Sequence, residues 1–279
     1  MRGYVTIDRL GDFVRLTFHK TLGGHFEKDL PEPRGQVIRD EGDYWVARWR
    51  AEELNEEKAE ESKRVAIVRA RSCVRELALC NDWEYFFTGT LDSEKQDRFN
   101  LPKWVKDLGV WIGNYNKRYQ TKLRYLLIPE QHKNGAYHIH GLLSGVSPDS
   151  LEPNEYGYLD MPYYRRRFGF MSLSPIKSKM KLSSYVTKYI TKEQDTTNID
   201  FGKHRYYASR GLKRKERLGA FWASDKDYKW EWENDFVKQT TLDFTGQNVD
   251  ISEICNIIEL RGVMKNENNY LQDRFLGEG

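Results

Sequence analysis

Two apolar segments joined by His132-Lys133-Asn134-Gly135 constrain the fold of this chain more than any other feature. The flanking runs, 124–130 and 136–143, have the length and the aliphatic and aromatic content of β-strands. Asn-Gly is the dipeptide preferred in tight β-hairpin turns. With Asn134 at the tip, Glu130 lies directly opposite His138. The chain is therefore expected to contain an antiparallel sheet with this hairpin inside it.

The second strand of the hairpin carries His138-Ile139-His140. Alternate residues of a strand point to the same face, so both imidazoles share one side and Ile139 points to the other. Glu130, across the hairpin, lies on the histidine side and completes a set of three candidate metal ligands. One carboxylate and two imidazoles suit Mg²⁺ or Mn²⁺, with Gln131 and His132 as reserve ligands if the register shifts. The alternative is a pair of polar histidines on a half-exposed face.

A tandem Tyr-x-x-Lys repeat occupies 185–192, with Tyr185 before Lys188 and Tyr189 before Lys192. We expect a helix over 183–194, with Ser183 or Ser184 as its N-cap. Residues four apart share one helix face, so both phenols point to the same place. Tyrosine is a weak nucleophile that needs a nearby cation or metal for activation, and the lysines provide cations. The alternative is an aromatic pair packed beside Leu182, Val186 and Ile190.

Further elements surround these two motifs. The pattern predicts strands at 83–91, 168–176 and 206–208 and helices at 50–80 and 102–120. The order β-α-β-β-α-β from residue 83 onward is that of a split βαβ unit. We therefore predict an α+β fold of ferredoxin-like type, with a central antiparallel sheet and helices on one face that carry the two tyrosines.

Charge is unevenly distributed. Residues 161–218 contain fifteen Lys and Arg but four Asp and Glu, whereas 219–279 contain six and twelve. Cations interspersed with aromatic rings suit a single nucleic-acid strand, although a solvated basic face has the same composition. The residues predicted to bind DNA are Arg165, Arg166, Arg167, Lys177, Lys179, Lys181, Arg210, Lys213 and Arg214.

These shifts in composition predict three regions. Residues 1–60 form a β-rich N-terminal extension, 61–218 the domain with both motifs, and 219–279 an acidic appendage with a helix at 251–260. No apolar run reaches the roughly 18 residues of a membrane span, and the three cysteines lack metal-site spacing. These features suggest a cytoplasmic protein that does not act on a membrane. No P-loop motif is present, so we expect no fused helicase.

Three segments, in this order, resemble the motifs of rolling-circle replication initiators of the HUH endonuclease superfamily. Phe86-Phe87-Thr88-Gly89-Thr90-Leu91 looks like the first strand motif, with Gly89 where the family usually has leucine. Tyr137-His138-Ile139-His140-Gly141-Leu142-Leu143 looks like the metal motif. Tyr185-Val186-Thr187-Lys188-Tyr189 looks like the nucleophile motif of the two-tyrosine branch, found in phage and plasmid initiators.

The resemblance implies a metal-dependent nick in single-stranded origin DNA. Tyr185 or Tyr189 would attack the scissile phosphate, leaving a 5′-phosphotyrosine and a free 3′-OH, and the strand could later be rejoined without ATP. Lys188 and Lys192 would stabilise the developing charge. A separate helicase and polymerase of a bacterial host would be partners. The sequence leaves open which tyrosine cuts first and whether Tyr189 only packs.

Two kinds of alternative remain. The same chemistry serves two-tyrosine transposases, which usually carry a zinc-binding cysteine cluster, and relaxases, which usually have a third histidine in the metal motif. An alternative of another class is a non-catalytic regulator that binds single-stranded DNA on a similar sheet.

Overall fold

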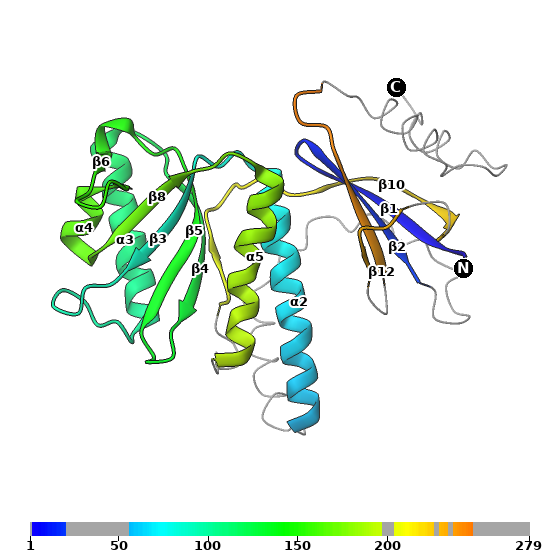
Figure 1. Cartoon of the computed structure of the whole chain (residues 1–279), viewed down its shortest axis with the longest axis horizontal. Coiled ribbons are helices and arrows are strands. Elements are labelled where there is room, and N and C mark those ends of the chain that lie inside the picture. The colour runs from blue at the N-terminus through cyan, green and yellow to red at the C-terminus, as the bar shows by residue number, and fades with distance from the viewer. Residues whose placement is uncertain (1, 21–55, 197–203, 226–228, 234–236, 248–279) are drawn as a thin grey trace. The chain divides into compact units, whose positions relative to one another are not determined.

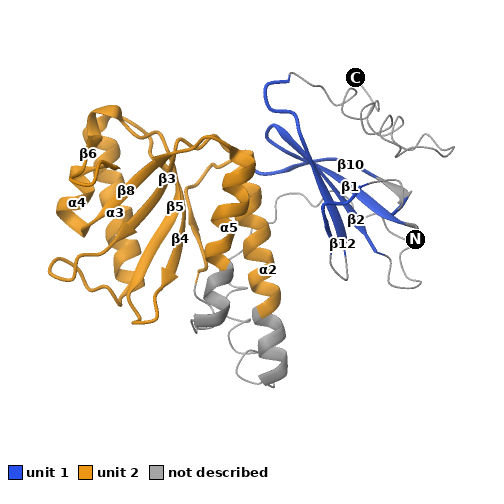
Figure 2. Cartoon of the chain, in the orientation of Figure 1, with its two compact units in different colours: residues 1–39, 214–279 blue, residues 40–213 orange. Residues whose placement is uncertain are grey.

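The computed structural model describes residues 2–20, 56–196, 204–225, 229–233 and 237–247. The chain divides into two compact units (Figure 2). Unit 1 comprises residues 1–39 and 214–279, and unit 2 comprises residues 40–213. The predicted helix at 251–260 lies outside the described residues.

Unit 1 is built on a five-stranded antiparallel sheet in the order β10-β1-β2-β12-β11 (Figure 1). Its strands are β1 (Arg2–Leu10), β2 (Phe13–His19), β10 (Glu216–Ser224), β11 (Trp232–Glu233) and β12 (Val237–Asp243). Gly11, with a φ of 63°, allows the two-residue turn between β1 and β2. Buried Asp8 ties the sheet together through ion pairs with Arg15 of β2 and with Lys215.

The two ends of the chain therefore meet in one sheet, since β1 pairs with β10 and β2 with β12. This differs from the predicted division, in which the extension 1–60 and the appendage 219–279 were separate regions. Pairing between strands some two hundred residues apart leaves no local mark on a sequence, because each strand shows only its own alternation.

Unit 2 contains a seven-stranded antiparallel sheet in the order β6-β7-β8-β3-β5-β4-β9. Its strands are β3 (Tyr85–Thr90), β4 (Arg124–Gln131), β5 (Tyr137–Ser144), β6 (Glu152–Pro153), β7 (Leu159–Asp160), β8 (Met171–Pro175) and β9 (Tyr207–Ala208). The predicted α+β class with a central antiparallel sheet is confirmed. The predicted hairpin is β4–β5, and Glu130 pairs with His138 as expected.

Helices cover both faces of this sheet, not one face as predicted (Figure 1). The helices are α2 (Glu56–Cys80), α3 (Leu101–Tyr119), α4 (Pro162–Phe168) and α5 (Lys179–Thr196), with a 3₁₀ turn, η1 (Pro148–Ser150). Helices α3 and α4 pack into one core and α2 and α5 into the other. The reason is visible in β4, where Leu126 and Leu127 point to opposite cores. A strand with apolar residues on both sides needs a cover on both sides.

Helix boundaries follow local hydrogen bonds. Helix α3 begins after Asn100, whose side chain accepts a 3.0 Å bond from the backbone N–H of Lys103. Helix α5 begins one turn earlier than predicted, so Ser183 and Ser184 are internal and are not its N-cap. Ser178 precedes the helix, and its hydroxyl accepts from the N–H of Lys181.

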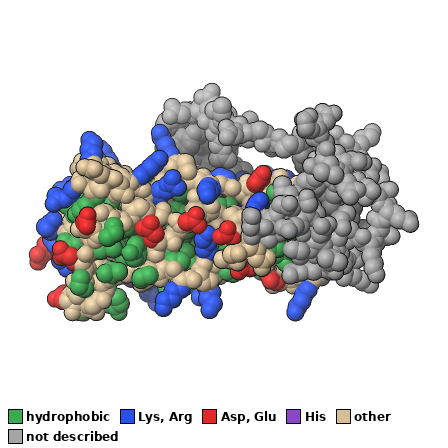
Figure 3. All heavy atoms as spheres, turned by 90° about the horizontal axis from the view of Figure 1, so that it is seen from above, with side chains coloured by type: hydrophobic (Ala, Val, Ile, Leu, Met, Phe, Trp, Pro, Cys, Tyr) green, Lys and Arg blue, Asp and Glu red, His purple; other side chains and the backbone are tan. Residues whose placement is uncertain are grey.

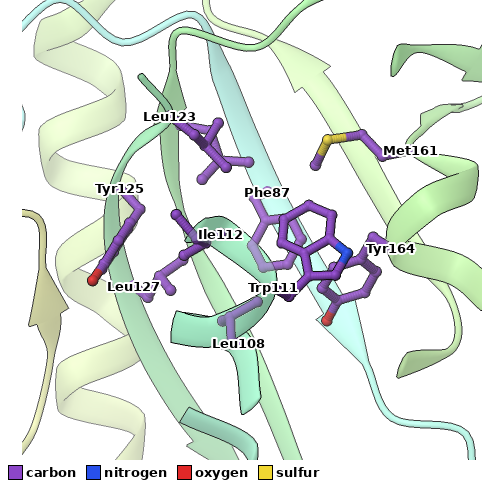
Figure 4. Close-up of a pocket in the computed structure, with 10 residues that line it drawn as sticks. Phe87, Leu108, Trp111, Ile112, Leu123, Tyr125, Leu127, Met161 and Tyr164 are labelled. Carbon is purple, nitrogen blue, oxygen red and sulfur yellow. The ribbon is translucent and has the colours of Figure 1, made fainter. Parts of the chain in front are cut away.

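The core between α3 and the sheet encloses a small apolar cavity of about 10 Å³ (Figure 4). Phe87, Leu108, Trp111, Leu127 and Tyr164 are among the side chains that line it. A volume of that order holds one water at most, and the apolar lining offers a water no partners. The cavity is a packing void, and it lies on the face opposite to the histidines.

Candidate nucleotidyl-transfer site

Cross-strand pairing on β3, β5 and β4 aligns two rows of side chains on one face of the unit 2 sheet. One row is Thr90, His138 and Glu130, and the next begins with Thr88 and His140. The same face holds Leu126, Ile128 and Leu142, which pack against α2 and α5. Ile139 points to the α3 core, as its position between the histidines predicts.

Each histidine is held through its Nδ1 atom by a threonine of β3. Thr88 Oγ1 lies 3.2 Å from Nδ1 of His140, and Thr90 Oγ1 lies 3.0 Å from Nδ1 of His138. Hydrogen bonds of this kind fix the ring orientation and the tautomer of imidazoles that bind metals through Nε2. The sequence indicated the threonines as part of a motif but not this role, which appears only once β3 is known to pair with β5.

Glu130 contacts the second histidine and not the one it faces across the hairpin. Its Oε2 lies 2.7 Å from Nε2 of His140. Because a carboxylate only accepts hydrogen bonds, Nε2 of His140 carries the proton in this arrangement. Both side chains are largely buried, with relative exposures of 14% and 10%.

His138 lies in a setting that disfavours its charged form. Burial, followed by the proximity of His132 and His140, lowers the pKa of His138 from 6.5 to about 4. The ring of His132 stacks on that of His138 with centroids 3.9 Å apart. A neutral imidazole at physiological pH keeps a lone pair that a metal can take. Gln131 is not near these ligands, because it pairs with Tyr137, whose ring packs in the α3 core.

The predicted ligands therefore share one face and one end of the sheet, but they do not form a closed set. Within the ranges that the structure describes, no group of three or more His, Cys, Asp or Glu side chains is arranged to hold a metal ion. Glu130 is hydrogen-bonded to His140, whereas His138 lies against His132. The donor types fit a hard divalent cation, and the Nδ1 contacts fit ligation through Nε2.

Helix α5 brings both tyrosines onto this face. Val186 and Ile190 are fully buried among residues of α2 and the sheet, which fixes the rotation of the helix. The ring of Tyr189 stacks on His140, with centroids 3.9 Å apart and planes at 20°. The ring of Tyr185 meets Phe86 edge-on at 5.2 Å. The predicted common face of the helix is thus the face that meets the histidines.

The two tyrosine hydroxyls touch each other. The hydroxyl of Tyr189 donates a 2.7 Å hydrogen bond to the hydroxyl oxygen of Tyr185. Tyr185 is 44% exposed, whereas Tyr189 is 8% exposed. Burial, the bond to Tyr185 and the nearby Glu130 carboxylate raise the pKa of Tyr189 well above its usual value. Tyr189 thus both packs in the core and reaches the site with its polar end.

Of the two predicted lysines, Lys188 is placed by the structure. Its Nζ lies 5.7 Å from the ring centroid of Tyr185, within cation–π distance. The side chain of Lys192 lies outside the described residues.

The predicted DNA-binding residues fall into separate places. Arg165, Arg166 and Arg167 belong to α4, whose Tyr164 and Phe168 pack on the face opposite to the histidines, and Arg165 pairs with Asp160 at 3.0 Å. The structure does not bring these arginines to the tyrosines. Proximity in sequence was misleading here, because the chain passes from one face of the sheet to the other between α4 and α5.

The remaining cations of the predicted set lie near the start of α5 or after β9. Lys177 and Lys181 are exposed there, and Lys179 forms an ion pair with Asp82. Lys213 is fixed through its backbone, since Asn81 bonds both its N–H at 2.8 Å and its C=O at 3.0 Å. Arg210 is exposed in the preceding turn, and Arg214 falls in unit 1. In the view from above, basic side chains alternate with acidic ones over the described residues (Figure 3).

Residues 84–194 match a family model described as Replication-associated protein, of the ORF2 type. The match covers less than half of the chain, but it includes β3, the hairpin with both histidines, and the part of α5 with both tyrosines. It supports a role as a replication initiator, which implies DNA binding. No curated protein and no solved structure matches the chain. None of the described helices is long and apolar enough to cross a membrane.

Proposed function

We propose that this protein starts rolling-circle replication by nicking and rejoining single-stranded origin DNA through a tyrosine of α5. The observation that carries the proposal is the contact between the two motifs: Tyr189 of α5 stacks on His140 of β5. A histidine–carboxylate pair, a second histidine and two phenols share one face, inside the segment that matches a replication family.

The reaction transfers a phosphoryl group from one oxygen to another. The phenolic oxygen of Tyr185 forms a bond to the scissile phosphorus as the bond from phosphorus to the 3′ oxygen breaks. The phenol loses a proton, and the departing 3′ oxygen gains one, so the products are a 5′-phosphotyrosine and a free 3′-OH. The ester bond is exchanged and not hydrolysed, so the reverse step can rejoin the strand without ATP.

A divalent cation, Mg²⁺ or Mn²⁺, fits this chemistry. His138, His140 and Glu130 would hold it, and when bound it would polarise the scissile phosphate. His140 must then offer the lone pair of Nε2 and carry its proton on Nδ1 instead. Thr88 suits both states, because a hydroxyl can donate to Nδ1 or accept from it.

The two tyrosines have different parts in this proposal. Tyr185 is the first nucleophile, since it is exposed to an incoming strand and its oxygen already accepts a hydrogen bond from Tyr189. A donor that faces the phenolic oxygen stabilises the phenolate as it forms. Lys188, near the Tyr185 ring, adds a positive charge to the same place. Tyr189, buried against His140, then serves the second cleavage once Tyr185 is occupied.

Covalent capture tests the proposal. The full chain is incubated with Mn²⁺ and libraries of single-stranded oligonucleotides from phage and plasmid origins, and adducts are resolved on denaturing gels. We expect an adduct that is lost in chelator and in the Tyr185→Phe/Tyr189→Phe double variant. It should persist in Tyr158→Phe, which removes another exposed hydroxyl of unit 2. A protein that binds the strands but never forms an adduct would be a regulator, and the proposal would be wrong.

One observation favours a second candidate, a conjugative relaxase. His132 lies against His138 and supplies the third histidine that such enzymes usually have. A relaxase would form its adduct with a plasmid transfer origin and not with a replication origin, so the same capture experiment separates the two. A separate helicase must open the duplex in either case, because the chain has no P-loop motif.

A further inference from the structure

Two exposed aromatic rings lie in contact near the β7–β8 edge of the unit 2 sheet. Tyr156 is 67% exposed and Phe170 is 40% exposed, and their ring centroids are 6.2 Å apart. Neither ring belongs to the core clusters of unit 2. Exposed large rings in contact with each other often mark a binding surface.

The position of Tyr156 is set by a well-bonded turn between β6 and β7. The side-chain oxygen of Asn154 accepts bonds of 3.0 Å from the backbone N–H groups of both Tyr156 and Tyr158. The backbone of Asn154 also bonds Tyr158 at 2.8 Å and Gly157 at 2.9 Å. Gly157, with a φ of 78°, supplies the left-handed conformation that the turn requires. The ring is therefore presented by a structured hairpin.

Phe170 is close to the proposed metal ligands. Its carbonyl accepts a 2.8 Å bond from the N–H of Thr90, and Thr90 is the cross-strand partner of His138. The next residue, Met171, is buried in the α3 core, so alternation places Phe170 on the histidine face. Phe170 is thus about two strand spacings, roughly 10 Å, from His138.

The surface between them is partly open and lined by hydroxyl groups. Helices α2 and α5 pack over β4 and β5, and the side chains of β3 and β8 on the same face remain partly or fully exposed. These side chains are Thr88, Thr90, Ser172 and Ser174. Arg166 and Arg167 are exposed on α4, just before Phe170 in the chain. Hydroxyl groups suit a sugar-phosphate backbone, and cations suit its phosphates.

We propose that Phe170 and Tyr156 form a stacking platform for one unpaired base of the DNA strand that passes over the β3–β8 strip. The inference rests on the proposed function for the identity of the strand. Stacking on an aromatic ring is tolerant of sequence, because every base has a π-face. The platform would hold the strand at a fixed distance from the scissile phosphate, so it would act as a positioning element and not as a catalytic group.

A binding cycle on the full-length protein tests the platform. Anisotropy of a labelled mixed-sequence single strand is measured in chelator, so that no cleavage occurs, and a single abasic site is moved along the strand. For the wild type, we expect one abasic position to weaken binding roughly 5- to 150-fold. In Phe170→Ala the loss should already be present, and the same abasic site should cause no further loss. Tyr156→Ala should behave similarly, with a smaller effect.

Tyr158→Ala is the matched control, since it removes an exposed ring of the same turn that is not part of the pair. It should bind as the wild type does, and all three variants should melt at wild-type temperature. The platform is wrong if Phe170→Ala binds normally, or if every abasic position is additive with it. This outcome is separable from a failure of the proposed function: adduct formation without coupling at Phe170 refutes the platform alone, and coupling without any adduct refutes the nickase alone.

Discussion

The hydroxyl of Tyr189 donates its hydrogen bond to the oxygen of Tyr185, and not the reverse. The two residues of the tandem motif are therefore not equivalent before DNA arrives. The exposed oxygen is the acceptor, and the buried phenol, stacked on His140, is the donor. A sequence shows two identical Tyr-x-x-Lys units, whereas the fold gives each unit a different environment.

Single phenylalanine variants should separate the two roles. With a single-turnover oligonucleotide substrate and Mn²⁺, Tyr185→Phe should lower the rate of adduct formation by at least about 10²-fold, because the accessible nucleophile is gone. Tyr189→Phe removes only the donor to Tyr185, so its rate should fall by roughly 10-fold while the adduct still forms. Peptide mapping of the adduct identifies the linked residue. An adduct located on Tyr189 in the wild type would reverse the assignment.

Acid should destabilise unit 2 through His138. The pKa of His138 is lowered to about 4 by burial, so between pH 6.5 and 4 the unfolded chain binds a proton that the folded chain does not. Stability therefore falls as pH decreases through this window and is fully present above pH 6.5. Allowing for partial exposure, the loss is on the order of 1–2 kcal/mol. Urea unfolding at a series of pH values measures it.

His138→Gln is the control for this effect. It removes the titrating group while keeping a polar side chain of similar reach, so the slope of stability against pH in the same window should become flatter. A slope equal to that of the wild type would assign the acid sensitivity to other residues.

Gly89 is required by the packing of the α3-side core. A Cβ at this position would lie 2.6 Å from both the Tyr164 hydroxyl and the ring of Phe87. The aromatic ring of Tyr164 thus fills space that a leucine in this motif would need. Gly89→Ala should lower the free energy of unfolding of unit 2 by about 1–3 kcal/mol, as overpacking of a core does. Thermal or urea unfolding measures the change.

Gly113→Ala is the matched control, because nothing lies within 4 Å of a Cβ placed there, and the residue is inside α3. This variant should gain roughly 0.5–1 kcal/mol from higher helix propensity. Adding Tyr164→Phe to Gly89→Ala removes one of the two close atoms and should recover part of the loss. Equal effects of Gly89→Ala and Gly113→Ala would contradict the packing argument.

Local patterns in the sequence predicted the parts of the site that depend on local geometry. Asn134-Gly135 set the hairpin register that places Glu130 opposite His138. The spacing of four placed Tyr185 and Tyr189 on one face of a helix. Both inferences use a fixed repeat of the backbone, and so they needed no knowledge of the rest of the fold.

What depends on contacts between distant segments was not predicted. The cover of α3 and α4 on the second face was missed because adjacent apolar residues, such as Leu142 and Leu143, hide the alternation of a strand buried on both sides. The placement of Arg165, Arg166 and Arg167 away from the tyrosines has the same origin. The pairing of Glu130 with His140 depends on side-chain rotamers, which a register does not specify.

The threonines of β3 should control metal affinity without being ligands. Thr88→Val and Thr90→Val keep the β-branched shape and remove the hydroxyl that bonds Nδ1 of His140 or His138. Losing such a partner typically weakens metal binding 10- to 100-fold. Mn²⁺ binding to the DNA-free protein, followed by electron paramagnetic resonance or calorimetry, measures the effect independently of cleavage. Ser174→Ala, which removes an exposed hydroxyl of β8, should bind Mn²⁺ as the wild type does. If both valine variants also keep wild-type affinity, the histidines are oriented by packing alone; if His138→Ala keeps it too, the metal is held elsewhere.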